Sequence, residues 1–236
     1  PDRFQALAAL PMQDPDMATR ELERCVKDMG FIGALVNGFS QIGDPHTTAY
    51  LDEKQYWPFW DVCAALDVPF YLHPRNPLPQ DSRIYKGAEW LLGPIWAFGH
   101  ETAVHALRLM GSGLFDKHPN INIVIGHMGE GLPFSIWRVD NCNAWVPDRH
   151  KYPAKKRIAD YFQSNFYITT SGNFHTPALL NTMMVVGADR ILFSTDWPFE
   201  NIDHAALWFD AATISEEDRL KIGRTNAQKL FKLKGA

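Results

Sequence analysis

The stretch Arg190–Glu200, RILFSTDWPFE, decides the fold that we predict for this chain of 236 residues. Ile191–Phe193 is a short apolar run typical of a buried strand, and Asp196 follows just after that run ends. A buried charge without a partner is costly, so Asp196 is expected at a rim, in an ion pair or on a cation. The stretch therefore predicts a strand that delivers a carboxylate to a functional surface.

Two further apolar runs end in a similar way, but with a histidine. Val68–Leu72 leads into His73, and Ile121–Gly126 leads into His127. The carboxyl ends of parallel strands meet on one face of a domain, and imidazole with carboxylate suits Zn²⁺ or a similar divalent ion. We therefore predict that His73, His127 and Asp196 share a metal site or an acid–base site. The alternative for each histidine is a hydrogen-bonded side chain of the core or rim.

The spacing of the apolar runs predicts an α/β fold. Six strands, each followed by a helix, are expected to start near positions 4, 31, 68, 121, 166 and 191. Alternating strands and helices with continuous apolar strands favour parallel pairing. Polar residues at the ends of several different strands favour a (β/α)₈ TIM barrel over a doubly wound sheet. A barrel has eight strands, so we expect a single domain over residues 1–236 in which the N-terminal two strands are missing.

Helical periodicity and turn residues place the remaining elements. Ser40–Glu53 is expected to be a polar loop, and Pro74–Pro94, with four prolines, an ordered lid or a subunit contact. The expected helices are Met17–Met29, Gln55–Leu66, Phe98–Lys117, Glu130–Trp145, a helix ending at Phe162, Thr176–Val186 and a largely helical tail over Asp203–Leu233.

Composition excludes several classes of protein. The net charge of −4 gives no basic surface for nucleic acid or for an anionic membrane. Three widely separated cysteines argue against a disulfide framework and favour a reducing cytoplasm. No apolar run approaches the roughly 20 residues of a membrane-spanning helix, and no signal-peptide pattern opens the chain. We therefore expect a soluble, cytoplasmic protein.

Two stretches that resemble known motifs do not fit them. His100–His105 contains two histidines five residues apart, which lie roughly 140° apart around a helix and cannot share an ion as in zinc proteases. Gly126–Gly131 joins a strand to a helix but lacks the G-x-G-x-x-G spacing of dinucleotide-binding proteins.

Two charged residues after His127 are further candidates. Glu130 is close enough in sequence to orient the imidazole and raise its basicity, although a glutamate in the first turn of a helix is also common. Arg138 follows roughly two turns later and could bind a substrate carboxylate, although such an arginine is more often a surface group.

Four stretches together resemble the decarboxylase branch of the amidohydrolase superfamily, and most of all the gamma-resorcylate (2,6-dihydroxybenzoate) decarboxylases. The resemblance covers essentially all 236 residues. The stretches are FYLHPRNPLPQDSRIY at 70–85, NINIVIGHMGEGLPF at 120–134, DRILFSTDWPFENIDHA at 189–205 and KIGRTNAQKLFKL at 221–233.

The resemblance implies a role for each candidate residue. His73 matches a metal-binding histidine and Asp196 a metal-binding aspartate that also serves in catalysis. His127 matches the active-site histidine, Glu130 its partner and Arg138 a substrate contact. The family's first strand adds a Glu-x-His pair to the metal, and this chain contains no such strand. One divalent metal, most often Zn²⁺ with Mn²⁺ or Mg²⁺ as alternatives, no organic cofactor, and a homotetramer are implied.

The implied reaction is the reversible, non-oxidative decarboxylation of 2,6-dihydroxybenzoate, a small aromatic carboxylate, to resorcinol. One alternative is a metal-dependent hydrolase of the same superfamily, such as a lactonase, which attacks a carbonyl with activated water. A second is an inactive, truncated remnant. With His73 and Asp196 as its ligands, the chain is expected to bind metal far more weakly than a complete site.

Overall fold

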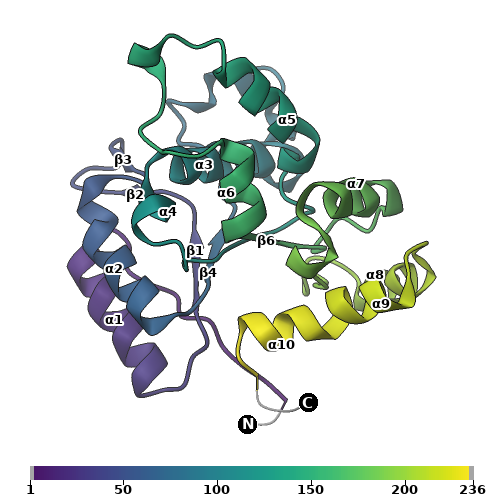
Figure 1. The fold of residues 1–236 in the computed structure, drawn as a ribbon. Coiled ribbons are helices and arrows are strands. Elements are labelled where there is room, and N and C mark those ends of the chain that lie inside the picture. Colours follow the sequence, from purple (N-terminus) through teal and green to yellow (C-terminus); the bar gives the residue numbers. More distant parts are fainter. Residues whose placement is uncertain (1–2, 234–236) are drawn as a thin grey trace. The chain divides into compact units, whose positions relative to one another are not determined.

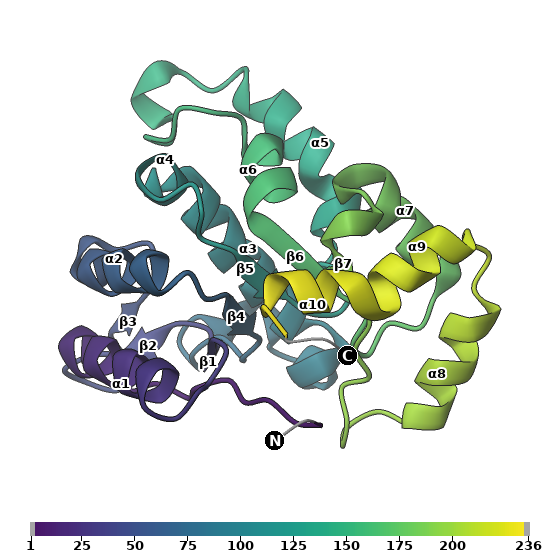
Figure 2. The ribbon, with the colours of Figure 1, turned by 60° about the horizontal axis from the view of Figure 1, so that its bottom comes forward.

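The computed structural model describes residues 3–233 (Figures 1 and 2), so the first two and last three residues of the predicted domain 1–236 lie outside it. The chain divides into two compact units, and each is described by itself. The first is Pro1–Ile121 with Tyr152–Lys155, and the second is Asn122–Lys151 with Lys156–Ala236. That residues 1–236 act as a single domain stays a prediction.

The first unit contains a parallel pair of strands covered by helices. Its strands β1 (Ala34–Asn37) and β4 (Phe70–His73) pair in parallel, with Asn37 opposite His73. Its helices are α1 (Pro15–Lys27), α2 (Trp57–Leu66), α3 (Ala97–Gly111) and α4 (Leu114–Lys117). Helices α1 and α2 lie side by side in both ribbon views. The strands expected near positions 31 and 68 and the helices expected at Met17–Met29 and Gln55–Leu66 are thus confirmed, with ends shifted by a few residues.

Helix α1 shows how local sequence sets such an end. The side chain of Asp14 accepts hydrogen bonds from the backbone N–H groups of Asp16 and Met17, at 3.1 and 3.0 Å. These bonds satisfy two of the N–H groups that a helix start leaves unpaired. The apolar side chains of the helix, Ala18, Leu22 and Cys25, are buried.

Two expectations for the first unit are wrong. Phe4–Leu10 is not a regular strand, because Ala8 alone forms a bridge, to Ala34, and Pro11 follows soon after. The expected loop Ser40–Glu53 contains a short antiparallel hairpin, β2 (Ser40–Gln41) with β3 (Thr48–Ala49). Its turn is held by the Asp44 carboxylate, which accepts from the backbone of residues 46 and 47.

In the first unit, the structure divides one expected helix and places short turns in the proline-rich segment. The expected helix Phe98–Lys117 is divided into α3 and α4, because Gly113 adopts a left-handed φ of +85°. The proline-rich segment Pro74–Pro94 contains the 3₁₀ turns Ser82–Tyr85 and Glu89–Leu91, and a third begins near its end at Gly93–Ile95. Its role as a lid or a subunit contact stays a prediction.

His105 on α3 is a buried histidine that cannot bind a metal together with His100. Its side chain is 0% exposed, and its Nε2 accepts the backbone N–H of Leu51 at 3.1 Å. Nδ1 therefore carries the proton, and it has no hydrogen-bond partner among the described residues. Burial, with a smaller repulsion from Arg108, lowers the pKa of His105 to about 3.

This histidine predicts a loss of stability in mild acid. The unfolded chain binds a proton on His105 below a pKa of about 6.5, whereas the folded chain does not until about pH 3. Stability therefore falls as pH falls below about 6.5, by about 1.5 kcal/mol from pH 6.5 to pH 5. Urea unfolding at a series of pH values should show this slope in the parent and a flatter one in His105→Gln.

The matched control for this experiment is His46→Gln. His46 is exposed, so its replacement should leave the slope unchanged. An equal slope in the parent and in His105→Gln would contradict the assignment of the slope to His105.

The second unit is built on three parallel strands. Strand β6 (Phe166–Thr169) pairs with β5 (Ile123–Ile125) on one side and with β7 (Ile191–Leu192) on the other. All residues of these strands are buried, as expected for parallel strands covered on both faces. Helices α5 (Leu132–Asn143), α6 (Ile158–Asn165) and α7 (Thr176–Val186) lie together in Figure 1. The strands and helices predicted here are confirmed.

The tail that was expected to be largely helical has three helices. They are α8 (Ile202–Ala211), α9 (Glu216–Leu220) and α10 (Asn226–Leu230), and a π-helical turn, Lys221–Thr225, joins the last two (Figure 2). The buried Asn226 side chain fixes this end of the chain, since its amide donates to the carbonyl groups of Ala188 and Ile191. Across residues 3–233, none of the helices is long and apolar enough to span a membrane.

Candidate active site

His127 and Glu130 form a short hydrogen bond at the end of strand β5. The Nδ1 of His127 lies 2.6 Å from Oε1 of Glu130, whose side chain is 5% exposed. A carboxylate only accepts, so Nδ1 donates and the other nitrogen, Nε2, faces away from this bond. The predicted pairing of the two residues is present, and it fixes the orientation of the imidazole.

The segment that carries both residues is a left-handed turn. All five residues from 127 to 131 have positive φ, with values of +50° for His127, +57° for Met128 and +54° for Glu130. Such angles are unfavourable for residues other than glycine and are found most often at functional sites. Helix α5 begins only at Leu132, so the alternative that Glu130 is an ordinary residue of its first turn is wrong.

Asp196 faces the free side of the imidazole. Its Oδ2 lies 3.7 Å from Nε2 of His127, and the two side chains are 27% and 28% exposed. This distance is too long for a direct hydrogen bond but fits two groups that bind the same small atom or water. The second unit therefore brings Asp196 close to the pair of His127 and Glu130, and the prediction that His73 shares this site stays a prediction.

The carboxylates of Glu130 and Asp196 both affect the pKa of the His127 imidazole. Burial opposes a charge on His127, but the hydrogen bond and negative charge of Glu130, with a further contribution from Asp196, raise its pKa above the usual value. His127 therefore holds a proton more readily than a free histidine does. The three residues can supply a cationic donor and a carboxylate to one bound molecule.

Arg138 is outside this cluster. It lies on α5 with an exposed side chain. In the part of the chain that the structure describes, no hydrogen bond or ion pair joins it to His127, Glu130 or Asp196. Its role in binding substrate stays a prediction.

His73 ends strand β4 of the first unit and has a defined tautomer. Its Nδ1 lies 3.0 Å from the carbonyl oxygen of Pro74. Because a carbonyl only accepts, Nδ1 carries the proton and Nε2 keeps a free lone pair. A backbone bond of this kind is typical of histidines that bind metals through Nε2.

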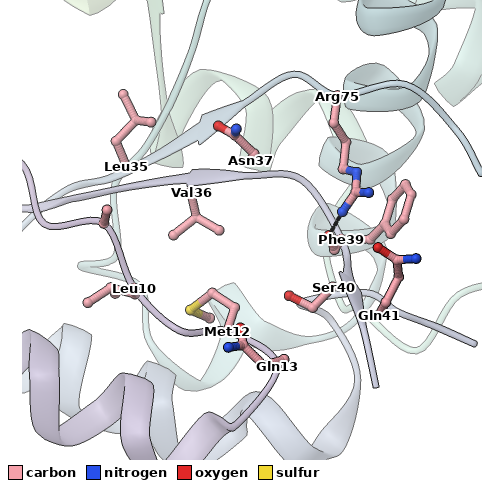
Figure 3. Close-up of a pocket in the computed structure, with 11 residues that line it drawn as sticks. Leu10, Met12, Gln13, Leu35, Val36, Asn37, Phe39, Ser40, Gln41 and Arg75 are labelled. Atoms are coloured by element: carbon pink, nitrogen blue, oxygen red, sulfur yellow. Dashed lines mark hydrogen bonds between the residues drawn. The ribbon is translucent and has the colours of Figure 1, made fainter. Parts of the chain in front are cut away.

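The first unit also has a pocket of about 650 Å³ near the end of β1 (Figure 3). Leu10, Met12 and Asn37 line it together with Arg75, whose Nη1 donates to the carbonyl oxygen of Phe39 at 2.7 Å. The Arg75 guanidinium also lies 3.9 Å from the centre of the Phe39 ring. Asn37 and Arg75 were not predicted as site residues, although Asn37 follows an apolar run and Arg75 follows His73 by two residues.

Comparison with known proteins identifies the family. A family model described as amidohydrolase matches residues 1–233. The chain belongs to the amidohydrolase family. The predicted fold class, a TIM barrel of the metal-dependent hydrolase type, is confirmed for this amidohydrolase by its structural neighbours.

Three relatives show how similar this amidohydrolase is to proteins of known activity. It is 69% identical to gamma-resorcylate decarboxylase of Rhizobium radiobacter, covering 100% of this chain and 72% of the relative. It is 68% identical to dihydroxybenzoic acid decarboxylase of Polaromonas sp. JS666, solved with manganese and the inhibitor 2-nitroresorcinol (TM-score 0.95, 99% of this chain and 70% of that one). It is 69% identical to 2,6-dihydroxybenzoate decarboxylase solved with 2,6-dihydroxybenzoate (TM-score 0.95, 99% and 72%).

The amidohydrolase chain carries donor atoms of the type that a divalent metal needs. His73 offers a free Nε2, and Asp196 offers a partly exposed carboxylate oxygen. Over residues 3–233, no group of three or more histidine, cysteine, aspartate or glutamate side chains is arranged to hold a metal. The donor types of His73 and Asp196 fit a divalent ion, and their role as metal ligands stays a prediction.

Proposed function

We infer that this amidohydrolase is a carboxy-lyase that removes the carboxylate of 2,6-dihydroxybenzoate without oxidation, giving resorcinol and CO₂ in a reversible reaction. The observation that carries this inference is the 69% identity to a gamma-resorcylate decarboxylase along the whole chain. The substrate is thus a small aromatic carboxylate, and no organic cofactor is needed.

In the proposed reaction, Asp196 is the proton donor. Its carboxyl group gives a proton to the ring carbon that bears the carboxylate. The bond between that carbon and the carboxylate then breaks, its electron pair restores the aromatic ring, and CO₂ leaves. Asp196 is 27% exposed, so that water can return a proton to it after each turnover.

His127 stabilises the negative charge of the bound substrate. Glu130 keeps the imidazole oriented and favours its protonated form. The Nε2–H of a protonated His127 is directed toward Asp196, so that a substrate oxygen between them meets a cationic donor. Arg138 is proposed to bind the substrate carboxylate.

His73 and Asp196 are proposed to hold the divalent metal, on the chemistry of their free nitrogen and oxygen atoms. The bound ion would supply Lewis-acid polarisation of the substrate's oxygens. Manganese in the Polaromonas relative supports a divalent ion, and Zn²⁺ is the ion that we propose. Activity of metal-stripped protein reloaded with Zn²⁺, Mn²⁺ or Mg²⁺ decides between them.

Direct assay tests the reaction itself. The protein that carries this sequence, with any residues its gene encodes around it, is incubated with a divalent metal and 2,6-dihydroxybenzoate. We expect resorcinol and CO₂ to appear in equal amounts, measured by chromatography and gas analysis. Hydrolysis of lactones without CO₂ release would favour a lactonase-like hydrolase, and the absence of both reactions would support the inactive remnant.

We also propose a homotetramer in the cytoplasm. Phe134 and Trp137 on α5 are 85% and 73% exposed, which is unusual unless a partner covers them. Cys25, Cys63 and Cys142 are all free thiols, as a reducing compartment favours. Light scattering of the purified protein and fractionation of cells test the two proposals.

A further inference from the structure

The four residues Thr169–Gly172 contact both halves of the candidate active site, and we name them the TTSG segment. They begin at the end of strand β6, whose neighbours β5 and β7 lead into His127 and Asp196. Thr169, Thr170 and Ser171 are 2%, 0% and 3% exposed. Buried hydroxyl groups are costly unless they form hydrogen bonds, so the partners of these groups indicate their role.

One part of the TTSG segment holds the left-handed turn of His127. The hydroxyl of Ser171 accepts the backbone N–H of His127 at 3.3 Å, and the Thr169 carbonyl accepts that of Met128 at 2.9 Å. The hydroxyl groups of Thr169 and Ser171 are 2.7 Å apart and bond to each other. The backbone of the turn is thus anchored at the two residues where its unfavourable φ values begin.

Thr170 holds the strand end that leads to Asp196. Its hydroxyl donates to the carbonyl oxygen of Ser194 at 2.8 Å and accepts the N–H of the same residue at 2.9 Å. Its own N–H donates to the carbonyl oxygen of Leu192 at 3.1 Å. The N–H and C=O groups of Ser194, two positions before Asp196, are therefore both bonded to the Thr170 hydroxyl.

Gly172 faces the space between the imidazole and the carboxylate. A Cβ atom at this position would lie 3.1 Å from Cδ2 of His127 and 3.4 Å from Oδ2 of Asp196. Its φ of +64° also favours glycine. Any side chain here would displace one of the two groups or fill the gap between them.

We propose that the TTSG segment is a positioning element, which sets the placement of His127 relative to Asp196 for decarboxylation. The inference rests on the proposed function. Thr170 and Ser171 act through the backbone of neighbouring strand ends and do not touch the substrate. Small displacements of reacting groups can lower rates by about 10²-fold, so the effect is measurable.

Thr170→Val tests the proposal, because valine keeps the shape and removes the hydroxyl. We expect kcat to fall by about 10- to 100-fold with KM changed less than about twofold, and Thr170→Ser to recover most of the lost rate. The control is Thr182→Val. Thr182 is equally buried, at 1% exposed, but its hydroxyl donates to the Ala178 carbonyl of its own helix, α7. The Thr182→Val variant should therefore keep the kcat of the parent protein.

Gly172→Ala tests the same proposal without removing a hydrogen bond, and keeps it testable if Thr170→Val does not fold. We expect a loss of kcat of about tenfold or more. Gly30→Ala is its control, since Gly30 has a similar φ of +72° with no atom within 4 Å of the added Cβ. The Gly30→Ala variant has the strain of an alanine at positive φ but no close contact with a neighbouring side chain, so it should keep the kcat of the parent protein.

A readout that does not depend on activity separates this proposal from the proposed function. In metal-free protein, the ¹H–¹³C signal of the His127 imidazole, assigned by its loss in His127→Gln, should move in Ser171→Ala but not in Thr182→Val. If the parent does not decarboxylate, this movement still supports the positioning role. An unmoved signal, or a kcat of Thr170→Val equal to that of Thr182→Val, would overturn it.

Discussion

Asp196→Asn should lower kcat for decarboxylation by about 10⁴-fold, the upper end of the range for loss of a general acid. Asparagine has the same shape but cannot give its proton to a ring carbon. It also tolerates the left-handed φ of +65° that Asp196 adopts, so the variant should fold. Steady-state kinetics measures the loss, and metal analysis of the same sample should show less bound ion.

Glu200→Gln is the matched control for Asp196→Asn. Glu200 is an exposed carboxylate four residues farther along the same loop, and its backbone N–H already bonds to the Asp196 carbonyl. The substitution removes one negative charge from the same segment without touching the cluster. A kcat of Asp196→Asn within tenfold of this control would refute the proposed role of Asp196.

Glu130→Gln should lower kcat by about 10- to 100-fold, the usual cost of losing a residue that orients an active-site group. Glutamine still accepts the bond from His127 Nδ1, so the geometry is kept while the charge is lost. The pKa of His127 should therefore fall, because Glu130 raises it in the parent. An NMR titration of metal-free protein measures this change directly.

The same variant should change how stability depends on pH. Since the pKa of His127 is raised in the folded chain, its pair with Glu130 stabilises the protein fully below about pH 6.5 and is lost as pH rises through the folded pKa. The parent should thus exceed Glu130→Gln in unfolding free energy more at pH 6 than at pH 9. Glu216→Gln, which breaks an exposed pair with Arg219, should show no such difference in slope. If plots of unfolding free energy against pH were parallel for the parent and Glu130→Gln, the pair of His127 and Glu130 would not contribute this pH dependence.

The sequence predicted the strand ends well, because those predictions depend on local patterns. Apolar runs that stop at His127 and just before Asp196 identify two members of the cluster, and the three-residue spacing identifies Glu130. For His73 it predicted a place at the end of a strand, which the structure confirms, and a role as a metal ligand, which stays a prediction.

Contacts between distant residues could not be predicted in this way. The bond from His127 to Ser171 joins residues 44 positions apart, and that from Thr170 to Ser194 spans 24. The segment Thr169–Gly172 directly follows an apolar run, but the partners of its side chains depend on which strands pair. Breaks such as the one at Gly113 depend on a single φ angle, which helical periodicity does not reveal.

The left-handed turn at residues 127–131 also limits how this protein can be engineered. A side chain on Gly129 would bring its Cβ within 2.9 Å of Pro133 Cδ, and lengthening α5 backwards would rewind the backbone that carries the imidazole. Libraries that seek new substrates should therefore leave this pentapeptide and Pro133 unchanged.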